Sequence, residues 1–287
     1  MSHFLTKRRA LVVWACAALL FVLAWWWRTG SMAAPDRVLS PLARRTIRTS
    51  SPPMQRVRGE FVRVYATNAV MASAILDEAE FSIGEISRRL GVAGSKRPVR
   101  ILLLGDFELI QREGFRPDSL AINFGDEIFL KDDAGQLARP DRVTHELVHF
   151  VLREAYGSQI PLWLDEGLAA RLGLAVSKSY RASRGRRVTG RRPGLSADRM
   201  DTLEVLTRRH TLPDDPEDAA VFYRASEELV GIIEDSIGTS RMPAYIAEVA
   251  EGEDWRAALN ARLDGSPLIN VSLEEAVRKR VTSQRDF

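Results

Sequence analysis

The chain has 287 residues, of which 45% are hydrophobic and 28% are charged. This balance is typical of a globular domain, and it excludes a wholly disordered chain, a collagen-like chain and a membrane protein with many spans. Lys and Arg number 41 against 38 Asp and Glu, so the net charge is only +3 and predicts no nucleic-acid partner. The single cysteine, Cys16, excludes an internal disulfide and a cysteine-rich zinc site.

The amino terminus has the pattern of a membrane anchor. A short basic tail, residues 1–9, precedes an unbroken apolar run over residues 10–27. A helix of these 18 residues spans roughly 27 Å, which is about the thickness of a hydrocarbon core. The alternative is a signal peptide that is cleaved near residues 31–33, but the length of the run favours a retained single-pass anchor. We expect the rest of the chain to lie outside the cytoplasm, in a periplasmic or extracellular space.

A basic linker is predicted between this span and the folded part of the chain. Residues 28–58 are rich in Arg, Ser and Pro, with Pro52 and Pro53 near their end. Such a composition cannot bury enough apolar surface to fold alone. The folded domain is therefore predicted to cover residues 59–287.

The first part of this domain has the residue alternation of β-strands. Residues 61–66 and 98–104 are predicted strands, and residues 121–124 and 127–130 flank a Gly-Asp pair as in a hairpin. Helical spacing of apolar residues marks the segments 70–90, 140–156, 161–174, 219–237, 242–250, 253–263 and 272–281. Because most helices follow the strands, the pattern predicts an α+β fold, with a small mixed β-sheet followed by a helical subdomain.

The segment from His145 to His149, His-Glu-Leu-Val-His, carries the clearest chemical signal. Residues four apart lie on one face of a helix, so two imidazoles at this spacing can bind one metal ion. Glu146 lies about 100° round the helix from His145, where it can stand beside the metal and take a proton from the water that the metal holds. This set of residues predicts Zn2+, which lowers the pKa of that water and polarises the carbonyl under attack.

A catalytic zinc site needs a third protein ligand and an open fourth position. The residues alone leave Asp165, Glu166 and His210 as candidates. A different role for Asp165 is to accept a hydrogen bond from a ligand imidazole, but helix geometry points it away from the face of Glu166 and favours a capping or surface role. His210 lies in a polar Arg-Arg-His-Thr stretch, which is typical of a solvated loop.

The His-Glu-Leu-Val-His motif and the later Trp-Leu-Asp-Glu-Gly-Leu-Ala segment at residues 163–169 together resemble the gluzincin metallopeptidases, a group related to thermolysin and the zinc aminopeptidases. The match is strong over these two segments, and the upstream strands and helix resemble the group only in outline. The resemblance implies a zincin-like fold, with zinc bound by His145, His149 and Glu166 and with Glu146 as the general base. The exopeptidase segment Gly-x-Met-Glu-Asn is absent, so aminopeptidase activity is not implied.

The same resemblance implies two further features. Gluzincins often supply a Tyr or His that stabilises the oxyanion of the tetrahedral intermediate, and Tyr223, at the start of a predicted helix, resembles the Tyr of this group. In such folds an edge strand beside the active-site helix pairs with extended substrate, and residues 121–124 or 127–130 are the candidates. The alternatives are a half-buried aromatic with a packing role and an ordinary hairpin.

A run of cations between Lys178 and Arg192, without an acidic residue, follows the predicted helix of Glu166. One interpretation is a basic flap near the cleft that favours acidic substrates. The other, which the composition favours, is a solvated loop. Nucleic-acid binding is not predicted, because Tyr180 is the only aromatic residue there that can stack on bases.

The sequence therefore predicts a membrane-anchored zinc peptidase that hydrolyses peptide bonds in a peptide or protein substrate. One alternative is a non-catalytic scaffold or envelope-assembly factor that keeps the fold. Glu146 argues against it, because a purely structural metal site has no use for a base. The other alternative is a zinc amidase that acts on cell-wall peptides, which the same site chemistry permits.

Overall fold

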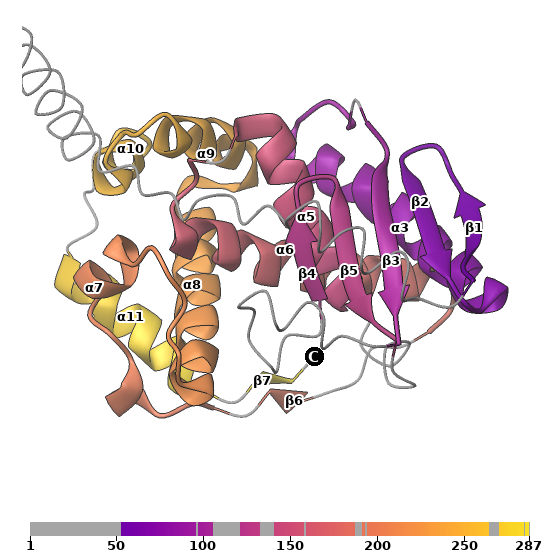
Figure 1. The fold of residues 1–287 in the computed structure, drawn as a ribbon. Helices are drawn as coiled ribbons and strands as arrows, with labels where there is room; N and C mark the ends of the chain where they lie inside the picture. The colour runs from indigo at the N-terminus through magenta and orange to yellow at the C-terminus, as the bar shows by residue number, and fades with distance from the viewer. Residues whose placement is uncertain are drawn as a thin grey trace, which may run out of the picture. The chain divides into compact units, whose positions relative to one another are not determined.

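The computed structural model describes residues 53–95, 97–105, 121–132, 141–157, 159–186, 191–192, 194–263, 270–283 and 285–286 (Figure 1). The predicted membrane span, residues 10–27, and nearly all of the predicted linker lie outside these residues. Among the helices of the described segments, none is both long enough and apolar enough to cross a membrane.

A five-stranded mixed sheet forms one layer of the fold (Figure 1). Its strands are β1 (Gln55–Arg58), β2 (Val62–Ala66), β3 (Val99–Leu104), β4 (Ala121–Phe124) and β5 (Glu127–Lys131). Their order is β1-β2-β3-β5-β4, with antiparallel pairs at both ends and parallel pairs around β3. The almost wholly apolar β3 lies at the centre, as expected for a strand that is buried on both faces. The predicted mixed sheet and its hairpin are confirmed.

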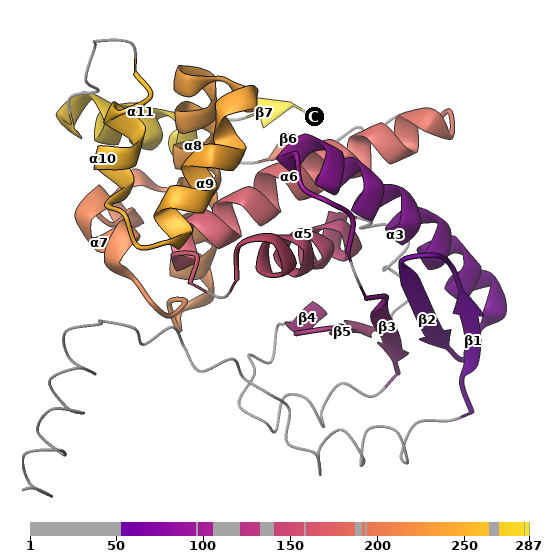
Figure 2. The same ribbon diagram turned by 90° about the horizontal axis from the view of Figure 1, so that it is seen from above.

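Two helices, α3 (Ala69–Leu90) and α5 (Asp141–Tyr156), lie on one face of the sheet, as Figure 2 shows. The side chain of Asn68 caps the start of α3 by accepting two backbone N–H groups, and Gly91 ends the helix at a φ of 62°. Apolar residues of both helices pack with the inward side chains of β2, β3 and β5 in one core. A smaller apolar cluster around Phe129 lies on the other face of the sheet.

The helical subdomain is built around α6 (Leu162–Ser183) and α8 (Pro216–Ile237). Helix α6 packs against α5 on one side and against α8 on the other, so it joins the sheet and its two helices to the rest (Figure 2). The remaining elements are η2 (Ala197–Arg199), α7 (Leu203–Arg208), η3 (Thr239–Arg241), α9 (Met242–Ala250), α10 (Trp255–Asn260), α11 (Asn270–Thr282) and the short pair β6 (Arg191–Arg192) and β7 (Arg285–Asp286). The predicted α+β class is confirmed.

Strand β1 and helix α7 are among the elements that the sequence pattern did not predict. Strand β1 begins at Gln55, inside the segment that was predicted as linker, because its backbone pairs with the open edge of β2 although its side chains are mostly exposed. Helix α7 has six residues, too few for a clear helical period. It begins at a local signal, the Thr202 side chain, which accepts the backbone N–H of Val205.

Helix α6 is longer than predicted and includes part of the predicted basic loop. It continues to Ser183 because its last turns are packed: Val176 is fully buried, and the ring of Tyr180 lies 5.4 Å from that of Phe81 on α3. The loop prediction for residues 178–192 is therefore wrong as far as Ser183. Residues 187–190 of that segment lie outside the described residues.

Candidate metal centre

Helix α5 brings its two histidines to one face. Val143, Leu147 and Phe150 are buried in the core, and their spacing fixes the rotation of the helix about its axis. His145 and His149, which are four residues apart, then share the side of α5 that faces α6. His149 is buried, whereas His145 is partly exposed.

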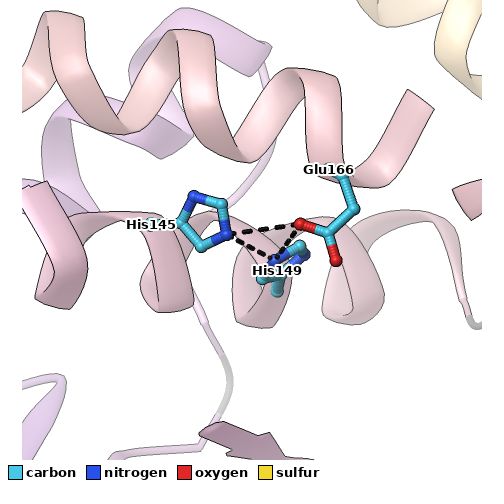
Figure 3. A group of neighbouring side chains, drawn as sticks. All are labelled: His145, His149 and Glu166. Carbon is cyan, nitrogen blue, oxygen red and sulfur yellow. Dashed lines mark hydrogen bonds and ion pairs between the residues drawn. The ribbon is translucent and has the colours of Figure 1, made fainter. Parts of the chain in front are cut away.

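Helix α6 places Glu166 opposite the two histidines, as Figure 3 shows. The Nε2 atoms of His145 and His149 lie 3.1 Å apart, and each lies 3.4 Å from Oε2 of Glu166. Among the described residues, these side chains form a group that is able to hold a metal ion. The three ligands that the resemblance implied are thus brought together.

The separations of the three atoms fit a tetrahedral zinc ion. Zinc binds imidazole nitrogen and carboxylate oxygen at about 2.0–2.2 Å, so two ligand atoms at the tetrahedral angle lie about 3.3–3.6 Å apart. The observed separations of 3.1, 3.4 and 3.4 Å are close to this range. Oε2 of Glu166 is also buried without a hydrogen-bond partner among the described residues, and a cation satisfies such an oxygen.

Asp165 orients His149 from the side away from this triangle. Its Oδ1 lies 2.9 Å from Nδ1 of His149, so Nδ1 donates to the carboxylate and Nε2 is the nitrogen that binds a metal once its proton is lost. The prediction of a capping or surface role for Asp165 is therefore wrong. The side chains of Asp165 and Glu166 do point apart. Helix α5 passes close to the first turns of α6, so Asp165 reaches Nδ1 of His149 and Glu166 reaches Nε2 of the same ring.

The charges around the cluster stabilise one another. Burial lowers the pKa of His149, but the carboxylates of Asp165 and Glu166 outweigh this effect and hold the pKa well above its ordinary value. Burial raises the pKa of Glu166, but His149 and His145 outweigh it and hold that pKa below its ordinary range. A buried carboxylate that stays ionised is suited to bind a divalent cation, because metal ligands must be deprotonated.

Glu146 lies on the same helix but is not one of the three donors. Its side chain is partly exposed, so it is open to a reactant. Burial nevertheless raises the pKa of its carboxyl, against the opposing effect of His145 and His149. A raised pKa suits a general base, whose best pKa lies near the working pH.

Of the two remaining candidates, Tyr223 lies beside the cluster and His210 does not join it. The ring of Tyr223 lies 6.4 Å from that of His145, with 71° between their planes. Tyr223 is about two turns inside α8 rather than at its start, since the helix begins at Pro216. His210 is exposed and is not part of the donor group, so the structure does not support it as a third ligand.

Two residues beside the site are not predicted by the sequence. Asn123 on β4 donates from Nδ2 to the backbone carbonyl of Glu146 at 3.0 Å, and its Oδ1 accepts from Arg153 at 3.0 Å. These bonds tie β4 to α5, and β4 rather than β5 is the edge strand of the sheet. Arg153 follows His149 by four residues, and this spacing could have predicted that both lie on the same side of α5. Asn123 gave none, because its partners are distant in sequence.

Two glycines of α6 permit the close helix crossings at the site. A Cβ at Gly173 would lie 3.2 Å from the backbone of His145, and a Cβ at Gly167 would lie 2.5 Å from the carbonyl oxygen of Ser226 on α8. Both crossings lie beside a candidate ligand, since Gly167 follows Glu166 in the chain. The absence of side chains at these positions therefore sets the depth at which α6 sits between α5 and α8.

No protein-family model and no curated protein matches this chain. Similar solved structures include leukotriene A4 hydrolase from Saccharomyces cerevisiae, with 17% identity, a TM-score of 0.43, and coverage of 69% of this chain and 33% of that chain. A mutant of the M1 zinc metallopeptidase from Deinococcus radiodurans has 12% identity, a TM-score of 0.36, and coverage of 80% of this chain and 52% of that chain. The chain thus spans about a third to a half of their length. With TM-scores this low, the similarity assigns neither a family nor an activity.

Proposed function

We propose that this protein is a zinc-dependent peptidase in which His145, His149 and Glu166 hold the metal. The observation that carries the proposal is the triangle of two Nε2 atoms and one Oε2 atom, with sides of 3.1, 3.4 and 3.4 Å. A donor set of two imidazoles and one carboxylate favours zinc over magnesium or calcium, which prefer oxygen ligands. When bound, zinc supplies a Lewis acid that polarises a carbonyl and lowers the pKa of water.

The side chains around the triangle carry out the other parts of the reaction. Glu146 takes a proton from the water as the water oxygen attacks the peptide carbonyl carbon. It then gives that proton to the departing amine nitrogen. Tyr223 donates from its hydroxyl to the carbonyl oxygen as negative charge develops there. Asp165 keeps His149 in the tautomer whose Nε2 is unprotonated.

The edge of β4 suits an extended peptide as substrate. Among the described residues, β4 pairs with β5 on one side only, so the backbone groups of its other side are available for a further strand. The bond from Asn123 to the carbonyl of Glu146 fixes that edge beside the base. A peptide that pairs with β4 would therefore pass the candidate metal centre.

The proposal includes a membrane anchor at residues 10–27 and an active site outside the cytoplasm. It rests on the basic tail and the length of the apolar run, about that of a bilayer core. We expect the full chain to remain with membranes after a carbonate wash and a chain without residues 1–27 to be released. Release of the full chain would contradict the anchor and leave the peptidase proposal intact.

Peptide hydrolysis tests the activity. The zinc-loaded protein should cleave members of a fluorogenic peptide library, a metal chelator should stop the cleavage, and Glu146→Gln should lower kcat by about 10²–10⁴-fold. Glu154→Gln changes an exposed carboxylate on the same helix and should leave the rate unchanged. If the folded, zinc-loaded wild type cleaves no peptide, the protein is not a peptidase and the scaffold alternative gains support.

A further inference from the structure

Arg153 is a cation of the metal-site helix without a carboxylate partner among the described residues. Within the described segments it makes one hydrogen bond, from NH1 to Oδ1 of Asn123 at 3.0 Å, and its side chain is partly buried. Five other arginines that are partly shielded from solvent pair with a carboxylate: Arg89, Arg100, Arg171, Arg209 and Arg262. A guanidinium has five N–H donors, so a neutral amide satisfies little of its capacity and none of its charge.

Its place on α5 directs Arg153 toward the same side as the proposed base. Arg153 follows Glu146 by seven residues, which is close to two full turns, so both side chains leave the helix in nearly the same direction. The rise of the helix separates them by about 10 Å. Asn123 forms hydrogen bonds with the carbonyl of Glu146 and with the guanidinium of Arg153. These two hydrogen bonds hold this side of α5 against edge strand β4.

We propose that Arg153 is a specificity-determining residue that binds a carboxylate of the substrate. This inference rests on the proposed peptidase function. An extended peptide rises about 3.3 Å per residue, so a carboxylate about three residues from the scissile bond reaches Arg153 when the scissile carbonyl lies beside Glu146. The planar guanidinium matches a carboxylate with two parallel hydrogen bonds.

The bond to Asn123 prepares the guanidinium for this contact. An arginine side chain that is already held in one position loses less conformational freedom when a ligand binds. The carboxylate has two possible sources, an Asp or Glu side chain within the peptide and the carboxyl terminus of a short peptide. Either source presents a carboxylate to Arg153, and the two peptide sets described next distinguish a side-chain carboxylate from a terminal one.

Matched peptide pairs test the inference on the full-length, zinc-loaded protein. One set of fluorogenic peptides carries Glu or Gln at each of the three positions on either side of the scissile bond, and the other set ends in a free carboxylate or an amide. We expect the carboxylate member of one pair to have a kcat/KM about tenfold higher, the effect of one charge-assisted hydrogen bond. In Arg153→Gln this ratio should fall to about one, and in Arg153→Glu a Lys peptide should be preferred.

A control and a binding measurement make the result specific. Arg88→Gln removes an exposed arginine of α3 and should keep the wild-type ratio. The inactive Glu146→Gln protein should bind the preferred labelled peptide about tenfold more tightly than its neutral partner in fluorescence anisotropy, and adding Arg153→Gln should remove the difference. Equal cleavage and binding of every pair by the wild-type site overturns the role of Arg153 and leaves the peptidase. Cleavage of no peptide overturns the peptidase and this inference with it.

Discussion

Two of the glutamates that the domain buries lie in different surroundings, Glu166 at the candidate metal centre and Glu78 between α3, α5 and α6. Burial raises the pKa of each carboxyl. At Glu166 two imidazoles outweigh burial and keep the group ionised, whereas at Glu78 the more limited effect of Arg181 leaves the pKa at about 8. Burial of a carboxylate is therefore not enough to make a metal ligand, and opposing donors decide whether the group holds a cation or a proton.

The same substitution at both sites tests this difference most strongly. Glu166→Gln removes an anionic ligand, so we expect the affinity for zinc to fall by more than about 100-fold, beyond the 10–100-fold typical of a residue behind a ligand. Glu78→Gln is the matched control and should keep the wild-type affinity. Competition with a chromophoric chelator measures both values, and equal losses in the two variants would refute the assigned ligand.

A smaller loss of zinc affinity is expected from the residue that supports a ligand. Asp165→Ala removes the acceptor of the Nδ1 proton of His149, so the ring is no longer held in one tautomer. We expect zinc affinity to fall by about 10–100-fold. Asp77→Ala, which removes an exposed carboxylate paired with Arg184, is the control. An affinity unchanged by Asp165→Ala would show that this contact does not support the site.

The helix crossing beside Glu166 is tested by a pair of glycines. A Cβ at Gly167 would lie 2.5 Å from the carbonyl oxygen of Ser226 and 2.7 Å from Cγ2 of Val230, so Gly167→Ala must displace α8. We expect a loss of about 1–3 kcal/mol in the free energy of unfolding. Gly84→Ala adds the same methyl group where no atom lies within 4 Å, and it should stabilise α3 by about 0.5–1 kcal/mol. Denaturant titration measures both changes, and effects of the same sign would contradict the crossing.

The proton on Glu78 predicts how stability depends on pH. The carboxyl ionises near pH 4.5 in the unfolded chain but near pH 8 in the folded domain. Between these values the unfolded state binds fewer protons, so the free energy of unfolding falls as pH rises, by up to about 1.4 kcal/mol per pH unit. Glu78→Gln has no such proton and should lose this part of the slope.

Chemical denaturation across the same pH range checks this prediction. Other titratable groups contribute equally to the pH dependence of the wild type and of Glu78→Gln. The difference between the two slopes of the free energy of unfolding against pH therefore reports the contribution of Glu78 alone. Glu154→Gln, at an exposed position of α5, should keep the wild-type slope. A slope in Glu78→Gln that equals the wild-type slope would show that Glu78 is not protonated in the folded domain.

Local patterns were enough to predict the parts of the site that depend on one helix. The spacing of His145 and His149 places them on one face of α5 without knowledge of the rest of the fold. Glu166 required the resemblance to the gluzincins, because its meeting with α5 depends on how α6 packs. The strands and most helices were also predictable, since apolar periodicity and capping signals such as Asn68 are local.

Contacts between elements account for what the sequence did not predict. The role of Asp165 was predicted wrongly because a helical wheel gives only its direction relative to Glu166 on α6. It does not show that the ring of His149 on α5 lies between the two carboxylates and contacts each of them. The last turns of α6 were read as a loop because of their cations, although Val176 and Tyr180 continue its apolar face at a spacing of four. Asn123 joins β4 to α5 across the chain, and no local pattern encodes such a pair.

Metal content shows directly whether His145, His149 and Glu166 bind zinc. Zinc in the full-length protein is measured by elemental analysis, beside Glu146→Gln and His149→Ala. We expect about one zinc per chain in the wild type and in Glu146→Gln, and no zinc in folded His149→Ala. Folded wild-type protein that binds no zinc, or zinc that survives His149→Ala, would contradict the proposed metal site.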